Sequence, residues 1–170
     1  MISIGLLIVR LAVGLTISAH GTQKVFGWFG GPGIKGFTGM TQSLNLRPAR
    51  AWAWMAALSE LLGGLLIATG LLNPIGSLVV MGTMMVAIGT VHLSKGFFAS
   101  NGGYEFPLLI MLSSLAIAFM GPGVISVDGL LGINLPEPAT FIIGLILVAL
   151  GATYAVIGPA TRARIQAQGA

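Results

Sequence analysis

The stretch AWAWMAALSELLGGLLIATGLL (residues 51–72) sets the class of structure that this chain can form. It holds 22 residues and one charged side chain, Glu60. A helix needs about 20 mostly apolar residues to cross the hydrocarbon core of a bilayer. Small residues recur along it at steps of three and four, which places them on one helix face and permits close approach of a second helix: Ala53, Ala56, Ala57, Gly63, Gly64 and Ala68. The stretch therefore predicts a membrane-spanning helix that packs tightly on a neighbour.

The composition of the whole chain extends this prediction. Hydrophobic residues make up 55% of the 170 residues and charged residues 7%, against about 25% charged residues in soluble domains. The basic residues are scattered and form no stripe that could bind nucleic acid. The chain has no cysteine, which excludes disulfides, thiolate metal sites and iron–sulfur clusters. We expect an all-α integral membrane bundle whose main partner is the lipid bilayer.

Hydropathy predicts five spanning helices. Their ranges are Ile2–Ala19, Ala51–Leu72, Ile75–Leu93, Tyr104–Met120 and Ala139–Gly158. The first lacks a basic leader and a small-residue cleavage site, so we expect it to be retained. The turn at Asn73-Pro74 predicts a tight hairpin between the second and third spans. Between the first two spans, apolar residues at helical spacing over 34–44 predict a short interfacial helix.

The distribution of basic residues predicts the orientation. Basic residues of short loops collect on the cytoplasmic side of a membrane. With five spans, one side receives no Lys or Arg, and the other receives seven: Lys24, Lys35, Arg47, Arg50, Lys95, Arg162 and Arg164. We expect a multi-pass protein of the bacterial inner (plasma) membrane with its N-terminus outside and its C-terminus in the cytoplasm.

Two charges lie inside predicted spans. Arg10 is near the middle of the first span and Glu60 near the middle of the second, where an isolated charge costs several kcal/mol and normally has a partner. At about 1.5 Å per residue, Arg10 lies about 15 Å above His20 and Glu60 about 12 Å above Trp52. The matching depths predict an Arg10–Glu60 ion pair. It could be a structural clamp or a proton-linked site.

A second polar group gathers where the predicted spans end on the basic side. Its members are His20, Lys24, His92, Lys95, Asn101, Tyr104 and Glu105. Such side chains could cap helix ends, carry protons or bind a polar group that enters from the bilayer. The sequence leaves these alternatives open.

The sequence does not support a dinucleotide, haem or metal site. Gly31, Gly33 and Gly36 form G-x-G-x-x-G, but no acidic residue follows at about 20 residues, so we discount a dinucleotide site. His20 and His92 could lie at one depth like axial haem ligands, but two histidines alone support this weakly. No ligand spacing for a metal appears, and we predict none. No motif encodes a cofactor.

Five ordered runs resemble the DoxX family of small bacterial membrane proteins. They are RLAVGL (10–15), HGTQKVFGWFGGPG (20–33), WAWMAALSELLGGLL (52–66), VHLSKGFF (91–98) and NGGYEFPLL (101–109). The resemblance implies a four-helix bundle over residues 1–130, which leaves residues 131–170 as an additional spanning helix with a basic tail. The family is named for a relationship to thiosulfate:quinone oxidoreductase subunits, so the resemblance implies a redox-linked membrane subunit near the quinone pool, with an unknown catalytic set.

Three functions remain open from the sequence. The first is a subunit of a redox-linked, quinone-coupled complex, in which electrons come from a bound cofactor or a partner protein because the side chains cannot hold them. The second is a non-catalytic anchor or assembly subunit. The third is a transporter of a small solute, with Arg10 as the attracting charge. The oligomeric state is not encoded in any motif.

Overall fold

The computed structural model describes residues 1–168, with the side chains of Glu137 and residues 159–168 excluded from the description. Seven α-helices follow one another, and no strand occurs in this part of the chain. They are α1 (Ile2–Phe26), α2 (Gly33–Ser43), α3 (Ala49–Thr69), α4 (Ile75–Ala87), α5 (Glu105–Met120), α6 (Val127–Leu131) and α7 (Glu137–Gln168). The predicted all-α membrane bundle is confirmed.

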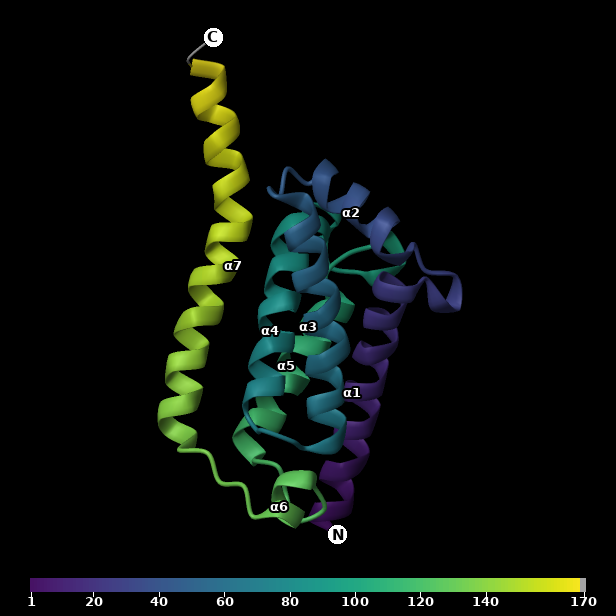
Figure 1. The fold of residues 1–170 in the computed structure, drawn as a ribbon, viewed down its shortest axis with the longest axis vertical. Helices are drawn as coiled ribbons and strands as arrows, with labels where there is room; N and C mark the ends of the chain where they lie inside the picture. The colour runs from purple at the N-terminus through teal and green to yellow at the C-terminus, as the bar shows by residue number, and fades with distance from the viewer. Residues whose placement is uncertain (169–170) are drawn as a thin grey trace.

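The long helices have the dimensions of membrane spans. Four of the described helical segments are long and apolar enough to cross a bilayer: Ile2–Phe26, Ala49–Thr69, Ile75–Lys95 and Pro138–Gly158. The third of these includes a π-helical turn, Ile88–His92, that continues α4. The shorter α5 has 16 residues. Helices α1, α3, α4 and α5 form one bundle, and α7 runs beside it next to α4 (Figure 1).

The first helix is longer than its predicted span. It continues to Phe26 rather than ending at Ala19, and Gly27 then closes it with a left-handed backbone, φ 77°. Gly21 lies inside this extension and packs directly on the backbone of Leu61 in α3. The segment from His20 to Lys24, which was expected to follow the span, therefore belongs to a packed helix.

Close packing joins α1 to α3, as the small-residue face predicts. A Cβ atom on Gly14 would lie 2.5 Å from the carbonyl oxygen of Gly64, so the two backbones are in contact there. One turn further along α1, the Ser18 hydroxyl donates to the Leu61 carbonyl at 3.1 Å. These contacts fix the antiparallel register of the two helices.

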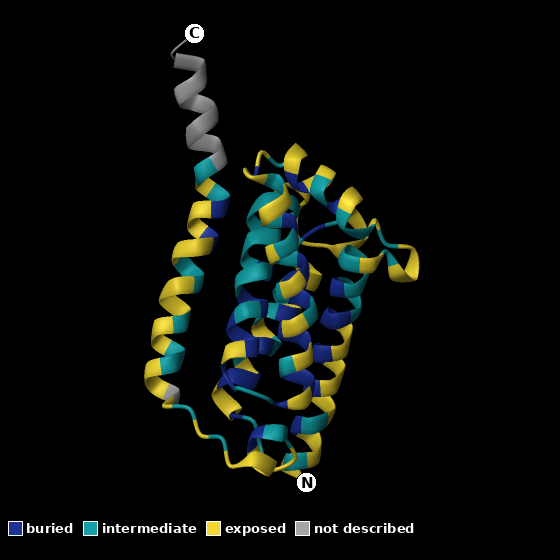
Figure 2. Cartoon of the chain, in the orientation of Figure 1, coloured by how far each residue is buried: buried dark blue, intermediate teal, exposed yellow. Residues whose placement is uncertain are grey.

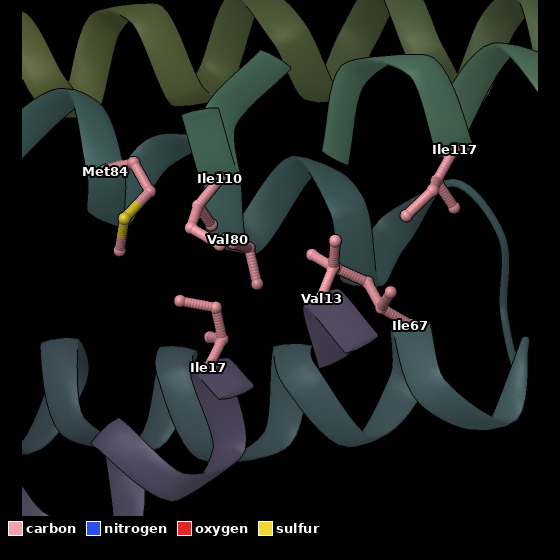
Figure 3. Packing of buried hydrophobic residues seen from close by; sticks show 7 residues of the cluster. All are labelled: Val13, Ile17, Ile67, Val80, Met84, Ile110 and Ile117. Carbon is pink, nitrogen blue, oxygen red and sulfur yellow. The ribbon is translucent and has the colours of Figure 1, made fainter. Parts of the chain in front are cut away.

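An apolar cluster fills the middle of the bundle. It draws on all four helices (Figure 3) and consists of Val13, Ile17, Ile67, Val80, Met84, Ile110 and Ile117. Burial of such side chains away from water does not drive association inside a bilayer, so helix packing there depends on shape and van der Waals contact. The buried residues lie on the inner helix faces and the exposed ones face outward (Figure 2).

Helix α7 packs on small residues of α4 and of the π-helical turn that follows it, and it remains open to lipid. Gly82 lies against Val148 and Gly89 against Val156. Within the apolar part of α7 only 11% of residues are buried, against at least 33% in the other three long spans. Most of its surface is therefore available to lipid (Figure 2).

The short α2 lies across the end of the bundle that is remote from the N-terminus (Figure 1). It occupies the range predicted for an interfacial helix. Phe37 is its buried anchor and packs on Ala53 and Ala57 of α3. The last residue of α1, Phe26, is exposed, and so are Trp28 and Phe29 in the loop before α2, as expected for aromatic side chains at the headgroup level.

Candidate functional site

The carboxylate of Glu60 lies inside the bundle. Glu60 belongs to the small-residue face of α3, and the side chain is 2% exposed. Oε1 accepts a hydrogen bond from the Lys24 ammonium, which is the one ion pair among the described residues. Oε2 is fully buried and has no hydrogen-bond partner among the residues that the structure describes. Because buried carboxylate oxygens are normally bonded, the free Oε2 can take a proton or a hydrogen bond from a ligand.

Lys24 reaches this carboxylate from the last turn of α1. Its side chain is 24% exposed, in contrast to the enclosed Glu60. Its Nζ also lies 4.9 Å from the centre of the Phe37 ring, a distance at which an aromatic face attracts a cation. Lys24 therefore connects the buried carboxylate to the end of the bundle that α2 covers.

The predicted Arg10–Glu60 ion pair is wrong. Gly14 packs on Ala68, so Arg10 lies opposite the far end of α3, and its Nη2 donates to the Ala68 carbonyl at 3.5 Å. Ala68 is eight residues from Glu60, or about 12 Å along the helix. The prediction took His20 as the end of the first span, but α1 continues to Phe26. The assumed register of α1 against α3 was therefore shifted, and the prediction paired Glu60 with Arg10 instead of Lys24.

Arg10 instead belongs to a second buried cluster at the opposite end. Its guanidinium also donates to the carbonyls of Pro122 and Ile125, the latter at 2.8 Å. The nearby Asp128 carboxylate, 3% exposed, accepts from the backbone N–H groups of Leu72 and Asn73, each at 2.9 Å. The Arg10 bonds tie the loop between α5 and α6 to α1, and the Asp128 bonds tie α6 to the α3–α4 turn. Sequence reasoning missed Asp128. An aspartate in a Gly-rich segment was a usable signal, because the chain has only four acidic residues.

The other predicted pocket residues divide between two places. His92 Nδ1 lies 2.7 Å from the Gly102 carbonyl. Since a carbonyl only accepts, Nδ1 is the donor in this contact. Glu105 Oε2 accepts from the Ala99 N–H at 2.9 Å in the same exposed loop. His92 and Glu105 thus organise residues 96–105.

His20 and Tyr104 make aromatic contacts instead. The His20 ring lies 5.6 Å from that of Phe106, and Tyr104 meets Phe97 edge-on at 5.5 Å. Lys95 and Asn101 are exposed. The structure therefore joins Lys24 to Glu60 but does not gather the seven polar residues into one pocket.

Neither metal nor haem chemistry has a prepared donor set here. The described residues contain no group of three or more His, Asp or Glu side chains that could hold a metal ion. His20 lies against the Phe106 ring and His92 against the Gly102 carbonyl. What the arrangement offers is a buried carboxylate with one free oxygen and an ammonium beside it, which suits proton transfer or binding of a polar group.

The comparisons with known proteins agree with this membrane architecture. A profile of the DoxX family matches residues 5–93, which contain most of α1 and all of α2, α3 and α4. The chain is similar to the Bacillus subtilis (strain 168) protein named "Putative oxidoreductase CatD", with 30% identity over 125 residues that cover 74% of this chain and 85% of the relative. No solved structure matches the chain.

Proposed function

The chain belongs to the DoxX family, and we propose that it is a membrane subunit of a redox-linked complex in which Glu60 handles protons for a quinone. The observation that carries this proposal is the buried, unpartnered Oε2 of Glu60 beside the Lys24 ammonium. A redox role is supported by the name of the Bacillus subtilis relative. The quinone is proposed from the resemblance to subunits of a quinone oxidoreductase and from the lipid setting of the bundle.

The chemistry limits what this chain contributes. Reduction of a quinone to a quinol takes two electrons and two protons. The sequence has no cysteine, and the electrons come from a bound cofactor or a partner protein. Protonated Glu60 gives its proton to a reduced quinone oxygen, and the carboxylate that remains is stabilised by Lys24 until a proton from the α2 end replaces the one lost. Lys24, partly exposed, is placed to pass that proton on.

The orientation belongs to the same proposal. Helix α2, its connection to α3, the first turn of α3 and the turn that ends at Lys95 lie at the end remote from the N-terminus (Figure 1). These segments carry Lys35, Arg47, Arg50 and Lys95. By the positive-inside rule this end faces the cytoplasm of a bacterial inner membrane. Protons for Glu60 would then come from the cytoplasmic side.

The test compares two buried carboxylates. The chain is purified from its native membrane in mild detergent, and co-purified quinones and proteins are identified by mass spectrometry. Quinone reduction by the complex is then measured for Glu60→Gln and for the control Asp128→Asn, which makes the same chemical change at the opposite end. We expect a loss of at least about a hundredfold for Glu60→Gln, the lower end of the range of about 10²–10⁴ attributed to general acid–base catalysis. We expect normal turnover per folded molecule for Asp128→Asn.

Other outcomes identify other functions. A stoichiometric redox partner that retains full activity with Glu60→Gln would make this chain an anchor or assembly subunit. Uptake of a solute by proteoliposomes that contain this chain alone would make it a transporter. Equal loss of activity in both variants would assign Glu60 a structural role.

A further inference from the structure

An open hollow lies where α7 passes the connection between α2 and α3. Its volume is about 750 Å³, and its lining consists of Gln42, Arg47, Pro48, Ala49 and Tyr154. This volume is within the about 300–1,000 Å³ of small-molecule sites. A smaller cavity shares Arg47 and Tyr154 and extends to Trp52 and Ala155. The two together form a recess between α3 and α7, which we call the α3–α7 recess.

Arg47 gives the α3–α7 recess a positive charge. The side chain is exposed, and no carboxylate pairs with it among the residues that the structure describes. A guanidinium can donate two parallel hydrogen bonds to the oxygens of one phosphate, which a lysine cannot. The ligand that fits this charge is therefore an anion with a phosphate-like group.

The surroundings of Arg47 indicate where that phosphate comes from. The rings of Trp52 and Tyr154 stack across the recess at 6.2 Å with planes 22° apart, and such side chains favour the headgroup level of a membrane. Further along α7, Leu147 and Leu150 are each 64% exposed. An apolar chain can lie along this surface while its headgroup stays beside Arg47.

We infer that the α3–α7 recess binds an anionic phospholipid, with Arg47 holding the phosphate and α7 contacting the acyl chains. The inference is independent of the redox proposal, because it concerns another surface and other residues. Basic recesses between spanning helices on the cytoplasmic side are known as headgroup sites. A bound lipid would also fill the space between α7 and the start of α3 and so stabilise the position of α7.

The experiment uses the full chain and a matched pair of variants. Arg47→Gln removes the charge that lines the recess. Arg50→Gln removes another exposed charge, three residues away, that does not line the recess. Retention of phosphatidylglycerol is measured by native mass spectrometry, and thermal stability is measured in detergent with phosphatidylglycerol, phosphatidylcholine or inorganic phosphate. Arg47→Lys serves as a second variant that keeps the charge but loses the bidentate geometry.

We expect phosphatidylglycerol to be retained and to stabilise the wild-type chain more than phosphatidylcholine does. Arg47→Gln should weaken its binding about fivefold or more, the effect of one basic residue at a membrane surface, and Arg50→Gln should leave it unchanged. Arg47→Lys should fall between wild type and Arg47→Gln. Equal weakening by the Gln variants would indicate general surface charge and overturn the site. Equal stabilisation by inorganic phosphate would overturn the assignment to a lipid.

Discussion

Gly14 of α1 and Gly64 of α3 lie in backbone contact, and this contact decides which charge pairs with Glu60. A Cβ atom on Gly14 would lie 2.5 Å from the Gly64 carbonyl oxygen. Antiparallel helices locked at this point place the last turn of α1 beside the middle of α3. Lys24 therefore reaches Glu60, and Arg10 reaches the opposite end of the bundle.

Enlarging this contact should disrupt the bundle. Gly14→Ala should destabilise the protein by about 1–3 kcal/mol, the usual cost of inserting a methyl group into a packed interior, because backbone atoms of α3 cannot give way. Gly5→Ala is the control on the same helix, since nothing lies within 4 Å of its added Cβ. Thermal unfolding in detergent measures both. A loss as large for Gly5→Ala as for Gly14→Ala would contradict the close contact.

Lys24 and Glu60 should be energetically coupled. The variants Lys24→Gln, Glu60→Gln and their combination form a double-mutant cycle, and we expect a coupling energy of about 0.5–3 kcal/mol from unfolding measurements. The reason is that Lys24→Gln leaves the buried Glu60 carboxylate without its charged partner. A matched control cycle uses Lys35→Gln in place of Lys24→Gln, since Lys35 is an exposed lysine of α2. In that cycle the effects of Lys35→Gln and Glu60→Gln on stability should add.

Arg10 and Glu60 should be independent of each other. A cycle of Arg10→Gln and Glu60→Gln should be additive within about 0.5 kcal/mol, as for separated residues. Arg10→Gln and Asp128→Asn should instead couple, because Arg10 holds the loop between α5 and α6 and Asp128 holds α6, which follows directly after that loop. Strong coupling of Arg10 to Glu60 would restore the ion pair predicted from sequence and refute the register described above.

Phe37 should shield Lys24 from solvent. The Phe37 side chain is 7% exposed, and its ring faces the Lys24 ammonium. Phe37→Ala should speed the modification of Lys24 by a water-soluble amine reagent, followed by peptide mass spectrometry. Phe98→Ala, at an exposed site, should leave the rate unchanged. An unchanged rate with Phe37→Ala would show that α2 does not cover the pair.

Asp128 should stabilise the α3–α4 turn. Asp128→Asn keeps the size of the side chain but replaces one acceptor oxygen with an NH₂ group, which cannot accept from the N–H of Leu72 or Asn73. An unsatisfied buried donor costs about 1–3 kcal/mol, and thermal unfolding should report a loss in that range. Asn134→Asp, at an exposed position in the next loop, should have little effect. Full stability of Asp128→Asn would mean that water replaces the lost bonds.

The sequence alone determined the membrane environment, the helical class and the small-residue face of α3. These follow from local properties: an apolar run of sufficient length has to satisfy its own backbone hydrogen bonds in lipid, and a helix is the way to do so. The position of α2 followed from the same periodicity. The need for partners at Arg10 and Glu60 was also local, because any charge at that depth requires one.

Only the tertiary structure decided which partners those charges have. The depth of a charge in the bundle can be counted in residues from the end of its helix. For Arg10 that count depends on where α1 ends, and the level at which it meets α3 depends on the Gly14–Gly64 contact. Neither is fixed by hydropathy, since Gly21 to Phe26 can be loop or helix until α3 packs against them. Asp128 is the same case: it is one acid in a short loop until folding brings it beneath the α3–α4 turn. Pairing between elements distant in sequence depends on register, and packing sets the register.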